Sequence, residues 1–367
     1  MSIPKRYHPV LMACIMAPLG MGVGYVIGKL FKGNLKSLDM GWEAIPVAIL
    51  VLWLVLATHE LGHAIGGWLA GFSLHFYAVG PLRIDQQAGR FKVSFNRTPS
   101  LWGGIAASSP DPQNIPPSEP LRRKMLLLVA GGPLASLLSG LMAFPAILLW
   151  PTHPRWAFAI MVFAFASLLI AFVTMLPIGN SGFVNDGGRI LQLLRRNDAA
   201  YRWISLATLG TLASQVRPRL WPAHLVEDTT RNPEPSYDGI MSMWMRFSWH
   251  LDRKEIPEAK LWLERALTHV DDWPAAAQPI LHSSAADFYA RLEPDIPRAR
   301  QHLAQAQKPG FMQPEAIALA EASVLIAEGN ASAAREKLNQ ARKLITTTSG
   351  SSRDSIAELI DELAAKA

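Results

Sequence analysis

The chain has 367 residues, of which 50% are hydrophobic and only 17% are charged. Its mean hydropathy of +0.16 is too high for an ordinary soluble protein of this length, so that class is excluded. The net charge of +6 comes without a basic helix or an aromatic-rich groove, so we expect no nucleic-acid partner, and a single cysteine excludes a disulfide framework.

Four apolar stretches are each long enough to cross a lipid bilayer, which needs roughly 20 apolar residues. Lys29 and Lys32 close the first stretch and no small-residue cleavage site follows it, which favours a membrane helix over a secretory signal peptide. Basic residues concentrate in loops that a cytoplasmic N-terminus would leave inside. We therefore expect an integral protein of a bacterial cell (inner) membrane, with its N-terminus and C-terminal domain in the cytoplasm. The stretches cover about residues 9–31, 44–71, 125–150 and 156–178.

The second stretch contains an H-E-x-x-H sequence, from His59 through Glu60 to His63. On a helix the two histidines lie on one face, four residues apart, with Glu60 beside them. Two neutral imidazoles supply two of the three protein ligands of a catalytic zinc ion (Zn2+), and a neighbouring glutamate can act as general base toward zinc-bound water. Polar residues in a membrane helix are costly unless they line a cavity or bind a ligand. The sequence predicts metal-assisted peptide hydrolysis; the alternative is polar packing between helices.

Residues 72–96, between the second and third stretches, predict a small β-hairpin. Phe91, Val93 and Phe95 alternate with polar residues, and residues 86–89 supply the turn. One interpretation is an edge strand to which an unwound substrate adds. The other is a hairpin on the membrane surface, anchored by its aromatic side chains. Five prolines between residues 110 and 120 predict a loop before the third stretch.

The third zinc ligand is expected after the fourth stretch, where an Asp-Gly-Gly-Arg sequence ends at Arg189. Asp186 is the candidate, because it is an acidic residue among glycines at a membrane boundary, followed by an amphipathic segment. Such an aspartate alone is more often a helix cap. The presence of H-E-x-x-H favours the ligand.

From about residue 200 the long apolar runs stop, and a soluble helical region is predicted. Three of its segments align on Ala259, Ala299 and Ala334, at a period of 35 to 40 residues. Each follows a more apolar segment, which is typical of tetratricopeptide-like helix pairs; a plain helical bundle is the alternative. The predicted domains are a membrane-embedded metalloprotease domain at 1–196, a linker at 197–234 and a soluble helical-repeat domain at 235–367.

These motifs resemble the site-2 protease family of intramembrane zinc metalloproteases over residues 44 to about 196. The match consists of the H-E-x-x-H, a Gly-Pro motif in the third stretch, and the segment from Leu176 to Arg189. The resemblance implies a core of three membrane helices, with residues 9–31 as an added helix. It also implies roles for the residues at the motif positions. Glu60 is the expected catalytic residue; the expected metal ligands are His59, His63 and Asp186; and substrate contacts are expected from Gly132, Pro133 and Ser136.

The sequence therefore predicts a mainly α polytopic membrane protein with four transmembrane helices, a small β-hairpin and a soluble C-terminal α-helical domain. Its expected activity is cleavage of membrane-embedded or membrane-anchored proteins near the cytoplasmic face. The C-terminal repeats are expected to recruit substrate or another protein partner. The alternative is a catalytically inactive membrane scaffold, because Ser136 and Thr174 stand where the family usually has asparagine. A transporter is less well supported, since the four spans show no internal repeat.

Overall fold

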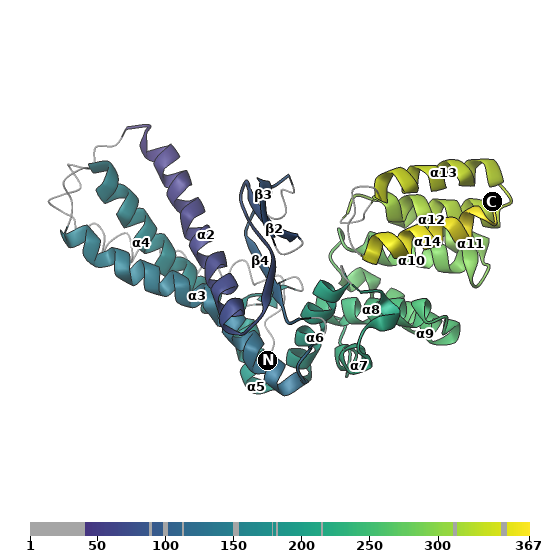
Figure 1. The fold of residues 1–367 in the computed structure, drawn as a ribbon, viewed down its shortest axis with the longest axis horizontal. Helices are drawn as coiled ribbons and strands as arrows, with labels where there is room; N and C mark the ends of the chain where they lie inside the picture. Colours follow the sequence, from purple (N-terminus) through teal and green to yellow (C-terminus); the bar gives the residue numbers. More distant parts are fainter. Residues whose placement is uncertain are drawn as a thin grey trace. The chain divides into compact units, whose positions relative to one another are not determined.

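The computed structural model is mainly helical in the part it describes, with a small antiparallel sheet (Figure 1). Two compact units are present. One holds the described residues up to Leu56 together with Ser136–Leu169, and the other holds Ala57–Ala135 and Ile170–Ala367. The first predicted span, 9–31, lies outside the described residues. The structure describes residues 41–87, 90–97, 102–111, 114–149, 154–177, 179–180, 183–213, 216–310, 314–345 and 351–367.

Three helices in the described part are long and apolar enough to cross a membrane. They are α2 (Ala44–Leu69), α3 (Ser118–Leu149) and α4 (Pro154–Met175). At 1.5 Å per residue, even a span of about 20 residues covers the roughly 30 Å of bilayer hydrocarbon. These helices match the second, third and fourth predicted spans.

The start of α3 differs from the prediction. The helix begins at Ser118, inside the segment predicted as a loop, and Pro120 lies in its first turn. Proline is tolerated there because the first N–H groups of a helix have no acceptor within the helix.

Large apolar side chains on these helices are exposed, as Ile49, Met142 and Trp156 illustrate. Of the most apolar 18 residues of each helix, only 17% are buried in α2 and in α4, and 33% in α3. This share is too low for helices in the interior of a soluble protein. Exposing so much apolar surface to water would be costly, whereas lipid accepts it. These three helices therefore indicate a membrane protein.

The predicted hairpin is part of a larger antiparallel sheet with the strand order β3-β2-β1-β4. Strands β2 (Leu82–Gln87) and β3 (Arg90–Phe95) pair as expected, and β1 (Ser73–Val79) joins them on the other side of β2. The fourth strand, β4 (Ile105–Ser109), was not predicted and pairs with β1, Ala106 lying opposite Tyr77. The sheet therefore has two edges, β3 and β4.

After α4 the chain forms the short strands β5 (Gly179–Asn180) and β6 (Phe183–Val184) and the helix α5 (Asp186–Arg195). Helices α6 (Asp198–Leu212) and α7 (Ala223–Thr229) follow, so residues 197–234 are largely helical although a linker was predicted. The division into domains at residue 196 stays a prediction. The residues that follow α2 and the first turns of α3 share one apolar core with α5 and α6. Its buried members are Ala70, Phe72, Leu121, Met125, Val129, Leu193, Ala200 and Ile204.

The C-terminal region is built of successive helices, as predicted. The second helices of three pairs are α9 (Ile256–Thr268), α11 (Ile296–Ala306) and α13 (Ala331–Leu344). Each begins three residues before one of the aligned alanines, and all three alanines are fully buried. A leucine four residues after each alanine is also buried, so one face of each helix packs against its neighbours. The other helices are α8 (Tyr237–Asp252), α10 (Gln278–Arg291), α12 (Pro314–Ala327) and α14 (Ser351–Ala364).

Candidate metal centre

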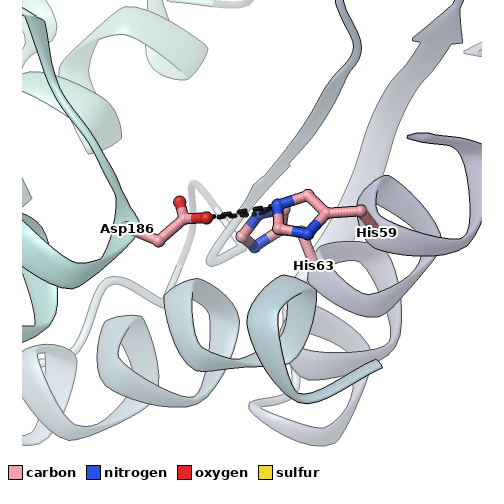
Figure 2. A group of neighbouring side chains, drawn as sticks. All are labelled: His59, His63 and Asp186. Carbon is pink, nitrogen blue, oxygen red and sulfur yellow. Dashed lines mark hydrogen bonds and ion pairs between the residues drawn. The ribbon is translucent and has the colours of Figure 1, made fainter. Parts of the chain in front are cut away.

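Three side chains from two segments that lie far apart in the sequence meet at one point (Figure 2). His59 and His63 project from α2, and Asp186 is the first residue of α5. The Nε2 atom of His59 is 3.2 Å from Oδ2 of Asp186 and 3.2 Å from Nε2 of His63. The Nε2 atom of His63 is 3.6 Å from the same carboxylate oxygen. The predicted convergence of these residues is therefore observed, and their role as zinc ligands stays a prediction.

The geometry of the cluster fits a zinc ion. Zinc binds imidazole nitrogen and carboxylate oxygen at about 2.0–2.2 Å, usually as a tetrahedron, and ligand atoms at the corners of such a tetrahedron are about 3.3 Å apart. The three separations, 3.2, 3.2 and 3.6 Å, bracket that value. Two histidines and one carboxylate leave a fourth position for water or substrate. Catalytic zinc sites use donor sets of this kind.

A backbone carbonyl fixes the orientation of His63. Its Nδ1 lies 2.9 Å from the carbonyl oxygen of Leu128, in α3. Since a carbonyl only accepts, Nδ1 carries the proton, and in the neutral ring Nε2 keeps its lone pair toward the cluster. Pro133, also in α3, has no N–H to donate to the carbonyl of Val129. Because Val129 directly follows Leu128, the Gly-Pro motif lies in the same part of α3 that contacts His63.

Glycines allow α2 and α3 to approach closely enough for this contact. A Cβ added at Gly62 would lie 2.3 Å from the carbonyl oxygen of Gly131, and one at Gly131 would lie 2.1 Å from that of Gly62. A Cβ at Gly132 would lie 2.3 Å from Nε2 of His63, the atom that faces His59 and Asp186. Small residues at helix crossings are how membrane helices gain van der Waals contact. Gly132 is therefore required for the position of His63.

The start of α5 holds Asp186 in place. Asn185 caps the helix, accepting from the N–H of Gly188 at 3.1 Å and donating to the carbonyls of Leu176 (2.5 Å) and Val173 (3.3 Å). A Cβ at Gly187 would lie 2.0 Å from the carbonyl oxygen of Met175, so the helix start is pressed against the end of α4. Because Asn185 takes the capping role, the Asp186 carboxylate is left for the histidines.

The charge of Asp186 suits a metal ligand. Burial raises the pKa of its carboxyl group, but the hydrogen bond with His59 and the close approach of His63 outweigh burial and lower the pKa to about 2. The carboxylate is therefore ionised at neutral pH. An ionised carboxylate is the form that binds zinc.

Glu60 lies beside the cluster and is only 9% exposed. The backbone N–H of Ala106, in β4, donates to its carboxylate. Gly104 has a φ of +100°, and a Cβ there would lie 2.7 Å from Oε1 of Glu60. The hydroxyl of Tyr77 donates to the carbonyl of Ala57 at 2.7 Å, and burial and the charge of Glu60 raise the pKa of Tyr77 to about 12. The sheet thus supports the glutamate.

The sequence did not identify some of these supporting residues. Asn185 carried a usable signal, because an asparagine directly before a helix start is a common N-cap. Gly104 and Ala106 carried none, since their contacts with Glu60 depend on the pairing of β4. Ser136, a predicted substrate contact, lies in α3 one turn beyond Gly132 and is fully buried. The roles of Gly132, Pro133 and Ser136 toward substrate stay predictions.

No family model, curated protein or solved structure matches this chain. The resemblance to site-2 proteases therefore depends on the motifs alone. The interpretation of the site depends on its geometry.

Proposed function

We propose that this chain is an intramembrane zinc metalloprotease of the site-2 protease type. Its substrates are membrane-embedded or membrane-anchored proteins, cut near the cytoplasmic face of a bacterial cell membrane. The observation that carries the proposal is the meeting of His59, His63 and Asp186 at zinc-ligand separations, beside a buried glutamate in the C-terminal half of the apolar helix α2.

The residues around the cluster have distinct tasks. Zinc, when bound, polarises the scissile carbonyl and acidifies water. Glu60 accepts a proton from the attacking water and passes it to the leaving nitrogen. The N–H of Ala106 and the close approach of Gly104 restrict the glutamate to one position. Such positioning matters because the base must lie within hydrogen-bond reach of the proton it takes.

We propose that an extended substrate pairs with the edge of the sheet beside Glu60. That edge is β4, whose residue Ala106 donates to the glutamate, whereas β3 of the predicted hairpin forms the opposite edge. Peptide hydrolysis needs an unwound backbone, and an edge strand can pair with one. We therefore assign substrate pairing to β4 and not to β3.

The C-terminal helices are proposed to form a tetratricopeptide-like array that recruits the substrate or a regulator. The repeated burial of Ala259, Ala299 and Ala334 supports a repeat architecture. Arrays of this kind present extended surfaces for protein partners. The N-terminus and this region are proposed to be cytoplasmic.

Replacement of the base tests the proposal. Glu60→Gln keeps the shape of the side chain and all three zinc ligands, so zinc content should stay at the wild-type level while cleavage of a reporter membrane protein stops. His59→Ala should lose both zinc and cleavage. Wild-type protein that holds zinc but leaves bound membrane proteins intact would favour the scaffold. Cleavage by Glu60→Gln at the wild-type rate would refute the assignment of the base.

A further inference from the structure

Helix α5 carries a buried charged side chain, that of Arg189, besides the partly buried Asp186. Arg189, one turn later, donates to both carboxylate oxygens of Asp238, with N–O distances of 2.6 and 3.1 Å. The side chains are 9% and 15% exposed, and the guanidinium lies over the ring of Trp203 at 5.0 Å. A bidentate, largely buried pair fixes both distance and orientation.

The partner of this arginine belongs to the C-terminal helices. Asp238 is in the first turn of α8, where Ser236 caps the helix. The opposite side of α8 contributes Ile240, Met243 and Phe247 to the core that it shares with α9 and α10. The ion pair therefore joins α5, which carries Asp186, to the packed helices α8, α9 and α10 outside the membrane spans.

The other supports of α5 act at its two ends. Asn185 attaches the start to the end of α4, and Arg122 of α3 donates to the carbonyl of Leu193 near the end, at 2.8 Å. Arg189 holds the middle turn. A helix of 10 residues fixed at three points has little freedom to shift the carboxylate at its first position.

We infer that Arg189 is a positioning residue for the metal centre, and that its pairing with Asp238 makes the first C-terminal helix part of the support of Asp186. This inference depends on the proposed zinc site. Replacing a residue that holds a metal ligand in place typically lowers metal affinity by 10- to 100-fold. Loss of the pair should therefore weaken zinc binding without removing any ligand.

The test uses the full-length chain. Asp238→Ala removes the partner, and the exchanged pair Arg189→Asp with Asp238→Arg restores it in reverse. The control is Asp287→Ala, because Asp287 pairs with Arg291 at a similar burial, 16% and 13% exposed, within α10. Two quantities are measured: zinc affinity by competition with a chelator, and amide hydrogen exchange of residues 186–195 in zinc-free protein.

In Asp238→Ala we expect zinc affinity to fall about 10- to 100-fold and exchange in α5 to rise at least about tenfold. The exchanged pair should recover part of both, and Asp287→Ala should change neither. Wild-type exchange in Asp238→Ala, or faster exchange with unchanged zinc affinity, would overturn the inference. The same result in Asp287→Ala would overturn it too, by showing general destabilisation. If wild-type protein binds no zinc, the proposed function fails, and without a metal to position the inference fails with it. If zinc binds but nothing is cleaved, the inference is still decided by these two measurements.

Discussion

The membrane helices around the metal centre and the C-terminal helices are packed in different ways. Where α2 meets α3, glycine lies on glycine, with Gly62 and Gly131 leaving no room for a Cβ. In the C-terminal region, α9 and α10 bury leucine, alanine and aromatic side chains, among them Leu263 and Phe288. Apolar side chains gain no hydrophobic free energy by moving from lipid into the protein. Membrane helices therefore gain stability from close backbone contact, whereas helices in water gain it from burial of apolar surface. The first arrangement positions the Nε2 atom of His63, and the second supplies stability.

The largest effect is expected from Gly132→Ala. The new methyl group would overlap Nε2 of His63, so zinc affinity should fall by at least about 100-fold while the helices remain folded. Zinc affinity and helical content by circular dichroism check this. Gly210→Ala in α6 is the matched control, because nothing lies within 4 Å of its Cβ and alanine favours a helix by up to about 1 kcal/mol. Wild-type zinc binding in Gly132→Ala would show that α3 does not lie against His63 as described.

Shortening a core side chain in the C-terminal region should have the reverse effect, lowering the free energy of unfolding while leaving zinc affinity almost unchanged. Leu263 is fully buried among the helices, and Leu263→Ala should lower the free energy of unfolding by about 2–5 kcal/mol. Zinc affinity of the folded protein should stay within about twofold, because neither Asp238 nor Arg189 is altered. Chemical denaturation and chelator competition measure the two quantities. A fall in zinc affinity as large as that of Gly132→Ala would erase the contrast between the two regions.

A smaller effect is expected from pH in the C-terminal helices. Nδ1 of His282 and Nδ1 of His302 lie 3.0 Å apart. Burial, His282 and Arg298 lower the pKa of His302 to about 4, against about 6.5 in an unfolded chain. Between pH 4 and pH 6.5 the unfolded chain binds more protons than the folded chain. The contribution of His302 to the free energy of unfolding is therefore complete above pH 6.5 and is lost as pH falls toward 4.

Since His302 is partly exposed, the loss should be about 1 kcal/mol. Thermal denaturation at pH 7 and pH 5 should show it in the wild type and show less of it in His302→Phe. Equal losses in both proteins would assign the pH dependence to other groups.

Apolar length and motif chemistry predicted the second to fourth spans and the three converging side chains. Long charge-free runs have few alternatives, and H-E-x-x-H restricts what its partner residue can be. What was missed depends on contacts between distant segments. Strand β4 is short and rich in alanine and serine, and it exists through its pairing with β1. The hold of Arg189 on Asp238, 49 residues away, likewise has no local signal.

Side chains from α2 and α5 are proposed to bind one ion together. Zinc content per chain, measured on wild-type protein and on Asp186→Ala purified in parallel, tests this most directly, because Asp186 is the ligand contributed by the second helix. We expect one zinc per chain in the wild type and its loss in Asp186→Ala. Equal zinc content in the two proteins, or none in the wild type, would contradict it.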